Sequence, residues 1–233
     1  RTKNLIPLSE PYSSLTGFTH YGSGGGESTT SAIINASGNN AVVDWVILDL
    51  IDKTSNTTIA ASQSALMQRD GDIISVQGED GVCFSGLTAD SFYIGLRHRN
   101  HLPVQTSAYV GLGDVPVTTD FSTVSLYGTH STTLVNSVKA LWAGDANSDQ
   151  KVVFTGSAED GADVVNGVLG HSGNLFNSRT YKYTEYSVFD VNMDGDVIFS
   201  GINNDVNLIK NNVVLHQGNT FKSLTYKIEG TRP

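Results

Sequence analysis

Residues 41–52 read AVVDWVILDLID, an apolar run broken only by Asp44, Asp49 and Asp52. Apolar and polar residues alternate only in part, which is typical of a central strand that is covered on both faces. We therefore expect Trp45 in a hydrophobic core, with Asp44 and Asp49 near the margins of the strand.

Shorter runs of β-branched and aromatic residues lie on both sides of this segment, separated by Gly, Asn and Asp, which accept positive φ in turns. Eight strands at this spacing predict a mainly β fold, an Ig-like or jelly-roll-type β-sandwich. The predicted strands are Ser31–Asn35, Ala41–Leu50, Thr57–Met67, Ile73–Val76, Val82–Phe84, Ser91–His98, Ser107–Leu112 and Val115–Thr118.

The composition changes near residue 140, beyond which Asp, Asn and Gly dominate. Apolar residues with helical spacing appear at Asp163–Leu169 and Asp205–Val214. We place a domain boundary near Ala140. Residues 1–140 are expected to form the β-sandwich domain with an N-terminal extended segment. Residues 141–233 are expected to form a second, smaller module with short helices and a C-terminal strand.

The second region contains a repeat. The stretch DANSDQKVVFTG, beginning at Asp145, aligns with DVNMDGDVIFSG, beginning at Asp190, and six positions are identical at a constant offset of 45 residues. At the same offset Asp160 matches Asp205, and each precedes a candidate helix. The repeated unit is therefore a loop, a strand, a second loop and a helix.

The spacing Asp-x-Asn-x-Asp suits calcium, because Ca²⁺ takes about six to eight oxygen ligands and alternate residues of a tight loop converge on one point. The seventh position normally offers a backbone carbonyl, and an acid at the following helix closes the shell. Such an acid also caps its helix, and an Asx-rich turn without metal is the alternative. Residues 141–233 are therefore expected to form a small duplicated calcium-binding module. The predicted ligands of its two Ca²⁺ sites are Asp145, Asn147, Asp149, Lys151 and Asp160, and Asp190, Asn192, Asp194, Asp196 and Asp205.

The two copies are not identical. Gln150 stands where such loops normally have Gly, although the position requires a positive φ that favours glycine. We therefore expect the first site to be weaker. Asp163 is a second acid near the start of the first helix and competes with Asp160 for the closing role.

The overall composition excludes several classes of protein. The chain carries 14 Lys and Arg against 23 Asp and Glu, a net charge of −9, which repels nucleic acid. Its one cysteine, Cys83, excludes a disulfide framework and is expected to be buried and inert. No apolar run is long enough for a membrane span, and the first residues lack the pattern of a secretory signal, so we expect a soluble chain that is already processed if exported.

Six stretches together resemble the C-terminal region of secreted surface and adhesin-like proteins of Bacteroidetes with dockerin-like, EF-hand-like calcium loops. The resemblance spans nearly the whole chain, but here about four residues are inserted before the last acid of each loop. It implies an extracellular or cell-surface location and a structural role in a filament or surface layer. The stretches are NLIPLSEPY, AVVDWVILDLID, ALMQRDGDII, SFYIGLRHRNHLPVQTS, LWAGDANSD and FDVNMDGDV.

The resemblance also implies a mode of assembly. In such proteins an extra strand precedes the segment that begins here at Arg1, so the sandwich would have an open edge. A neighbouring subunit could fill that edge by donating an extended tail, which would propagate into a polymer. The candidate donors are Arg1–Tyr12 and Phe221–Pro233. The alternative is that both ends pack on their own domain.

No enzyme motif accompanies these features, and we expect a non-catalytic protein. The densest polar cluster, Arg97-His-Arg-Asn-His101, lies in an extended segment whose alternate side chains face opposite sides, which favours structural hydrogen bonds over an acid–base pair. The alternative function is carbohydrate binding or adhesion, with glycans as partners. Tyr181, Tyr183 and Tyr186 would form its stacking platform, although a core-facing tyrosine stripe explains their spacing equally well.

Overall fold

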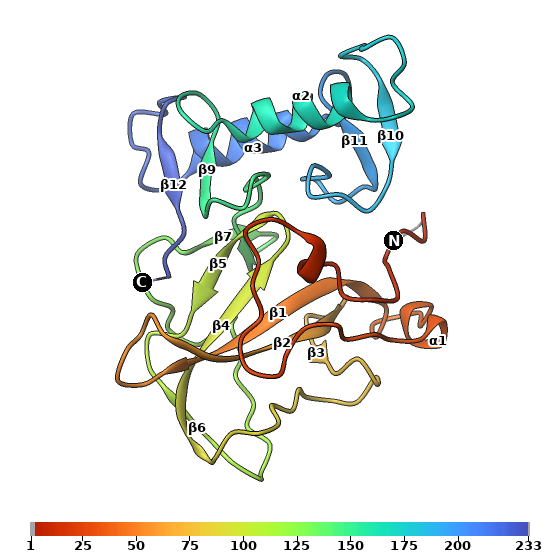
Figure 1. The fold of residues 1–233 in the computed structure, drawn as a ribbon. Helices are drawn as coiled ribbons and strands as arrows, with labels where there is room; N and C mark the ends of the chain where they lie inside the picture. Colours follow the sequence, from red (N-terminus) through yellow and green to blue (C-terminus); the bar gives the residue numbers. More distant parts are fainter. Residues whose placement is uncertain (1–2, 233) are drawn as a thin grey trace. The chain divides into compact units, whose positions relative to one another are not determined.

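The computed structural model describes residues 3–232 and divides the chain into two compact units (Figure 1). The sheet unit comprises Ile6–His98, Pro103–Thr129 and Thr231–Pro233, and the repeat unit comprises Arg1–Leu5, Arg99–Leu102 and His130–Gly230. The long segment of the repeat unit thus begins at His130 rather than near Ala140. The repeat unit also takes two short segments that the sequence assigned to the first domain.

The sheet unit is built on one antiparallel sheet. The strand order is β3-β2-β1-β4-β5, and the sixth strand, β6, also pairs with β4. Because these strands pair into a single sheet, the fold is mainly β but a two-sheet sandwich is not confirmed. The elements are the 3-10 helix Tyr12–Ser14, α1 (Ser31–Ile34), β1 (Val42–Asp52), β2 (Ile59–Gln68), β3 (Ile73–Ile74), β4 (Asp90–His98), β5 (His101–Gln105) and β6 (Val110–Leu112).

Most of the apolar stretch 41–52 forms the central strand β1, which pairs with β2 and β4. Trp45 is fully buried, as predicted. Asp44 and Asp49 are also buried, although they were expected near the strand margins. Ion pairing explains their burial: Asp44 Oδ2 lies 3.2 Å from His98 Nε2, and Asp49 accepts hydrogen bonds from Arg97 and Arg232.

Some short elements differ from the prediction. Ser31–Ile34 is a helical turn rather than a strand, because the Thr30 hydroxyl accepts a hydrogen bond from Ile33 N and caps it. Residues 82–84 and 115–118 are not strands, and β5 was not predicted. Cys83 is exposed, so the expectation of a buried thiol is wrong. Among the described residues, no helix is both long and apolar enough to cross a membrane.

The N-terminal segment is bound to its own unit. Pro7 O accepts a hydrogen bond from Trp45 Nε1 at 2.9 Å, and the hydroxyl of the fully buried Tyr12 donates to Trp45 O at 2.7 Å. Glu10 N donates to Glu27 O at 2.9 Å, so residues near Glu10 pair with the chain around Glu27 and Ser28. The described part of the first candidate donor segment therefore already has partners.

The repeat unit contains two helices of 11 residues and three small antiparallel sheets. One sheet is the hairpin β7–β8, and the other two are β9–β12 and β10–β11. The elements are β7 (Thr132–Val135), β8 (Val138–Leu141), β9 (Lys151–Val153), α2 (Asp160–Gly170), β10 (Lys182–Thr184), β11 (Asp196–Ile198), α3 (Asp205–Leu215) and β12 (Lys227–Glu229).

The pairing of these strands exchanges segments between the two copies of the repeat. The strands β9 and β11 occupy equivalent positions 45 residues apart, and so do β10 and β12. The early strand of each copy pairs with the late strand of the other copy. Neither copy therefore has a complete sheet of its own.

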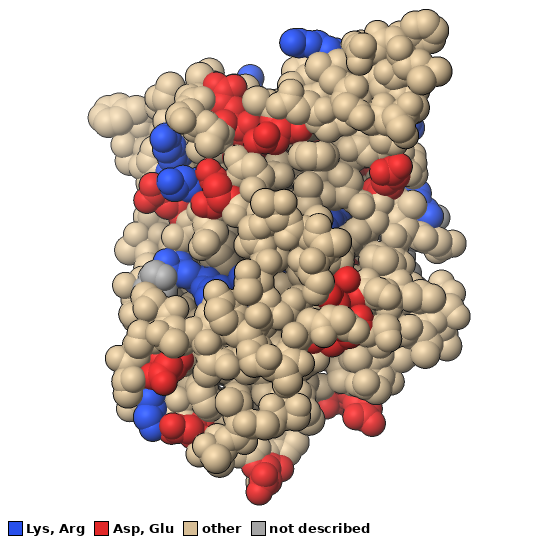
Figure 2. All heavy atoms as spheres, in the orientation of Figure 1, with Lys and Arg blue, Asp and Glu red and all other residues tan. Residues whose placement is uncertain are grey.

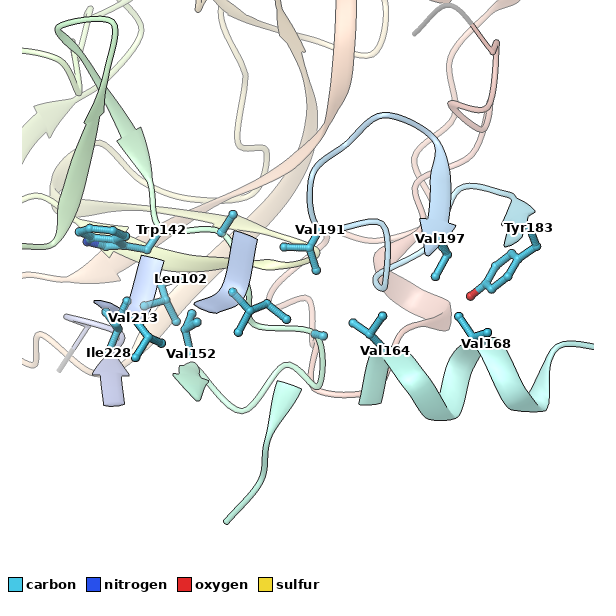
Figure 3. Close-up of a cluster of buried hydrophobic side chains, with 13 residues drawn as sticks. Leu102, Trp142, Val152, Val164, Val168, Tyr183, Val191, Val197, Val213 and Ile228 are labelled. Atoms are coloured by element: carbon cyan, nitrogen blue, oxygen red, sulfur yellow. The ribbon is translucent and has the colours of Figure 1, made fainter. Parts of the chain in front are cut away.

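The core of the repeat unit shows the same internal symmetry (Figure 3). Val164 and Val168 project from α2 toward Val197 and Tyr183 in Figure 3. Most members of this core are pairs separated by 45 residues, so both copies contribute to one core rather than to two. The pairs are Ala146 and Val191, Val152 and Val197, Val164 and Ile209, Val168 and Val213, and Tyr183 and Ile228.

Candidate metal centre

Loop one, residues 145–151, folds around the Asp145 carboxylate. Asp145 Oδ1 accepts a hydrogen bond from Asp149 N at 3.0 Å, and Oδ2 accepts one from Gln150 N at 3.1 Å. Asn147 Oδ1 also accepts from Asp149 N, and Asp149 Oδ1 accepts from Lys151 N. Successive Asx turns of this kind curl the loop tightly.

Loop two, residues 190–196, repeats this pattern with one difference. Asp190 Oδ2 accepts from Gly195 N at 3.0 Å, and Asn192 Oδ1 accepts from Asp194 N at 2.9 Å. Asp190 Oδ1, however, is buried and has no hydrogen-bond partner. A buried carboxylate oxygen without a partner is unfavourable, and a bound cation would supply the missing interaction.

The predicted closing acids, Asp160 and Asp205, are fully buried at the first residue of α2 and α3. Each uses both carboxylate oxygens to link the beginning of its loop to the strand that follows. A carboxylate has about four acceptor positions, so each keeps capacity for a further ligand. The donors are Ala146 N and Val153 N to Asp160, and Val191 N, Asn192 N and Ile198 N to Asp205.

Burial raises the pKa of four of these acids. The pKa of Asp145 rises to about 7 and that of Asp160 to about 8. The pKa of Asp190 rises to about 6, since Arg99 partly offsets the burial, and that of Asp205 rises to about 7. Ionising these groups is therefore unfavourable in the folded protein, and a nearby cation would reverse that effect.

Lys151 and Asp196 were predicted to act through their backbone carbonyls. The side chain of Asp196 is engaged elsewhere: Lys3 Nζ lies 2.6 Å from Oδ1 and Lys182 Nζ lies 3.0 Å from Oδ2. Burial alone would raise the pKa of Asp196, but bonds from Lys3, Thr184 and Lys182 lower it overall. The carboxylate of Asp196 thus belongs to ion pairs, and only its carbonyl remains for a metal.

The predicted strain at Gln150 is present. Gln150 has φ +65° and the equivalent Gly195 has φ +84°. The other left-handed position of each loop, Ser148 or Met193, has nearly the same φ in the two copies. Loop one therefore holds a long side chain in a conformation that favours glycine.

The donor set fits a hard cation. The predicted ligand atoms are carboxylate, amide and backbone carbonyl oxygens, which Ca²⁺ prefers. The orphaned Asp190 Oδ1 provides a free ligand atom in loop two. In loop one, Asn147 Nδ2 donates to Asp163 Oδ2 at 3.2 Å, so Asp163 positions Asn147 and does not replace Asp160, which bonds to the loop backbone.

The repeat extends further than the sequence analysis found. His171 and His216 lie at the ends of α2 and α3, and the Nδ1 of each accepts a hydrogen bond from a glycine N two residues later, at 3.1 Å in both copies. Asn174 and Asn219 each bond to the last turns of the preceding helix. The 45-residue offset of these pairs was the signal that the alignment of the loops alone did not use.

The polar cluster 97–101 is occupied by structural bonds. Arg97 and His98 pair with buried acids of the sheet unit. Within the repeat unit, Arg99 Nε donates to Ser187 O, and Asn100 Nδ2 donates to Val188 O and Asp190 O. His101 Nδ1 lies 2.9 Å from Asn100 Oδ1. Asn100 thus holds the backbone at the start of loop two.

The three tyrosines do not form one exposed platform. Tyr183 is buried in the core and stacks on His171 with ring centroids 4.2 Å apart. Tyr181 packs partly buried against the same core. Tyr186 lies under the Arg99 guanidinium, 4.4 Å from ring centroid to Cζ. These contacts support the core-stripe alternative.

The charged side chains lie in small separate groups on a mainly uncharged surface, on the face shown in Figure 2.

Comparison with protein-family models, with curated proteins and with solved structures finds no match to this chain.

Proposed function

We propose that this chain is a non-catalytic structural protein of the cell exterior, a subunit of a filament or surface layer whose repeat unit is a calcium-loop module completed by two Ca²⁺ ions. The observation that carries the proposal is the duplicated loop, in which each first aspartate and each closing aspartate is buried and has a raised pKa. A bound dication would offset the cost of ionising these buried carboxylates, and only the folded loops bring the ligands together, so binding and folding would be coupled.

Calcium binding would contract the loops. In the described residues, the carboxylates of neither loop have ligand atoms that all lie within 4.8 Å of one another. A cation would draw together the three predicted carboxylate ligands of each site, two from the loop and the closing acid, and relieve their mutual repulsion. Binding energy would then appear directly as stability of the repeat unit.

Calcium titration tests this part of the proposal. Isothermal titration calorimetry of the chelated protein should show two Ca²⁺ ions per chain, and Asp145→Asn and Asp190→Asn should each remove one. At a calcium concentration about a thousandfold above Kd, each site adds about 4 kcal/mol of stability. Glu79→Gln, an exposed acid of the sheet unit, is the control. Unchanged thermal unfolding after chelation would contradict the calcium sites.

Self-association is the second part of the proposal. Phe176 and Phe221 occupy equivalent positions of the two copies and are both 94 % exposed. Two such side chains offer repeated apolar contacts to other subunits. Strand donation is less favoured, because described residues of both candidate donors are already paired: Pro7 and Tyr12 with the sheet unit, and β12 with β9.

Electron microscopy with calcium and after chelation tests assembly. Ordered fibres or sheets that loosen on chelation are expected, and Phe176→Ser with Phe221→Ser should weaken them. Leu134→Ser, at another exposed apolar residue, is the matched control. Dispersed particles in both conditions would reject the structural-subunit proposal. The carbohydrate-binding alternative would then be tested with glycan arrays, although the contacts of Tyr181 and Tyr183 do not favour it.

A further inference from the structure

The glycine-rich stretch Gly22–Glu27 has no role in the calcium loops, yet it assembles a different set of ligands in the sheet unit. Glu10, His20 and Glu27 each offer a ligand atom, and these three atoms all lie within 4.8 Å of one another. The three residues are distant in sequence from the repeat, and their spacing gave no motif. Only the fold brings them together.

The Glu27 carboxylate is fixed through one oxygen and free at the other. Its Oε1 accepts hydrogen bonds from Gly25 N at 2.9 Å, Gln63 Nε2 at 2.8 Å and Ser64 N at 3.2 Å. Its Oε2 is buried and has no hydrogen-bond partner. His20 Nε2 lies 3.9 Å from this Oε2. The unpartnered oxygen therefore faces an imidazole nitrogen.

This part of the cluster is shielded from solvent. The side chains of His20 and Glu27 are only 7 % and 8 % exposed. An ionised carboxylate oxygen in such surroundings needs a hydrogen bond or a cation to offset its desolvation. The spacing of 3.9 Å is too long for a hydrogen bond, but two ligands of one metal ion are normally separated by about 3 to 4 Å, given metal–ligand distances of about 2 Å.

Glu10 is oriented by the neighbouring backbone. Gly26 N donates to its Oε1 and Ser13 N donates to its Oε2, both at 3.0 Å. A carboxylate has about four acceptor positions, so these bonds leave Glu10 capacity for a further ligand. Hydrogen bonds that hold a ligating carboxylate in place are typical of the surroundings of protein metal sites.

The glycines are required for this geometry. A Cβ on Gly24 would lie 1.9 Å from Ser62 O, and a Cβ on Gly25 would lie 3.2 Å from the His20 ring. Gly25 also has φ +98°. Glycine thus lets the loop approach both β2 and His20 closely enough for Gly25 N and Gly26 N to bond the two carboxylates.

We infer that Glu10, His20 and Glu27 form a second kind of metal site, one that takes a divalent transition-type cation such as Zn²⁺. An imidazole nitrogen with two carboxylates suits Zn²⁺, whereas Ca²⁺ prefers oxygen ligands alone. Binding through His20 Nε2 replaces its hydrogen bond to Ser64 Oγ, which is 2.8 Å long. Three protein ligands leave one tetrahedral position for water, and the ion would join Glu10 of the N-terminal segment to His20 and to Glu27 of the glycine-rich stretch.

The experiment is a titration of the calcium-loaded protein with Zn²⁺, and with Co²⁺ as a spectroscopic probe, in a Cys83→Ser background because Cys83 is exposed. One tight Zn²⁺ per chain and the visible absorption bands of four-coordinate Co²⁺ are expected. Glu27→Gln keeps an oxygen to accept the three bonds at Oε1 but cannot ligate through Oε2. It should weaken Zn²⁺ binding by more than about tenfold while the circular dichroism spectrum stays unchanged.

His20→Asn provides a second variant, and Glu79→Gln, at an exposed glutamate, is the control that should leave binding unchanged. If His20 is instead held as an imidazolium ion between the two carboxylates, the parent protein will bind Zn²⁺ no more tightly than Glu27→Gln does. That result, or octahedral Co²⁺ spectra identical in all variants, overturns the site. Calcium titration of the same samples keeps this outcome separate from any failure of the calcium proposal.

Discussion

The two copies of the repeat have the same fold, but they stabilise their first aspartate in different ways. In copy one, both oxygens of Asp145 accept backbone hydrogen bonds, and the loop contains the strained Gln150. In copy two, Asp190 keeps one oxygen without a partner, and its other oxygen lies 3.8 Å from Arg99 Nη2. A protein cation thus partly neutralises Asp190, whereas no ion pair among the described residues involves Asp145.

This difference separates two properties of a calcium loop. Backbone geometry favours copy two, because Gly195 adopts its positive φ without strain. Charge favours copy one, because Arg99 repels a dication near Asp190 and copy one has no such neighbour. Each property can be changed separately, so the order of affinities can be traced to its cause.

The largest effect should come from the closing acids. Asp205 accepts three backbone hydrogen bonds and Asp160 accepts two, and every donor would be left without its partner by an alanine. With calcium present, Asp205→Ala should lower the free energy of unfolding by about 4 kcal/mol and Asp160→Ala by about 3 kcal/mol. Urea denaturation measures both. Equal losses of stability, or a larger loss for Asp160→Ala, would show that the number of backbone hydrogen bonds does not set the contribution of each closing acid.

A core substitution in one copy should act on the other. Ile228 is buried on β12, which pairs with β9 directly after loop one. Ile228→Ala should lower the stability of the repeat unit by about 3 kcal/mol and should weaken calcium binding at loop one more than at loop two. Leu215→Ala, at an exposed residue, should change neither. Calorimetric titration resolves the two sites, and a loss confined to loop two would contradict the exchanged pairing.

Removing the charge of Arg99 should increase the calcium affinity of loop two relative to loop one. Arg99→Met should raise the calcium affinity of loop two by about tenfold, or about 1.5 kcal/mol, because the repulsion near Asp190 is lost. It should also lower the stability of the calcium-free protein, since Ser187 O loses a donor. Lys210→Met, on the solvent-exposed side of α3, serves as the charge-matched control. Unchanged affinity at loop two would show that Arg99 is screened from the site.

The smallest effect should come from the strained position of loop one. Gln150→Gly should raise the calcium affinity of loop one by about fivefold, because about 1 kcal/mol of backbone strain is relieved. Gly195→Gln should have the opposite sign and a larger size, since a Cβ there would lie 2.8 Å from Lys3 Cδ. If Gln150→Gly left the affinity unchanged, the φ difference between the loops would be irrelevant to binding.

The sequence predicted what depends on local pattern. The strand centred on Trp45, the helices after Asp160 and Asp205, and the positive φ of Gln150 all follow from periodicity or from the geometry of one turn. Long-range pairing was not predictable in this way. The burial of Asp49 depends on Arg97 and Arg232, which are far from it in the chain.

The candidate sites show the same limit. The predicted calcium ligands lie within one short stretch per copy, so spacing alone was enough to predict them. Glu10, His20 and Glu27 converge only because the glycine-rich stretch packs closely against β2, and no spacing rule connects them. The strand exchange was also hidden, because a 45-residue repeat is compatible with two separate sheets as well as with shared ones.

The exchange of strands also sets the order in which the chain can mature. A polypeptide is made from its N-terminus, so loop one and β9 emerge long before Lys227–Glu229, the strand with which β9 pairs. The sheet of the first copy therefore stays incomplete until residues 227–229 have been made. Folding of the first copy is therefore tied to synthesis of the second, and neither copy can be completed alone.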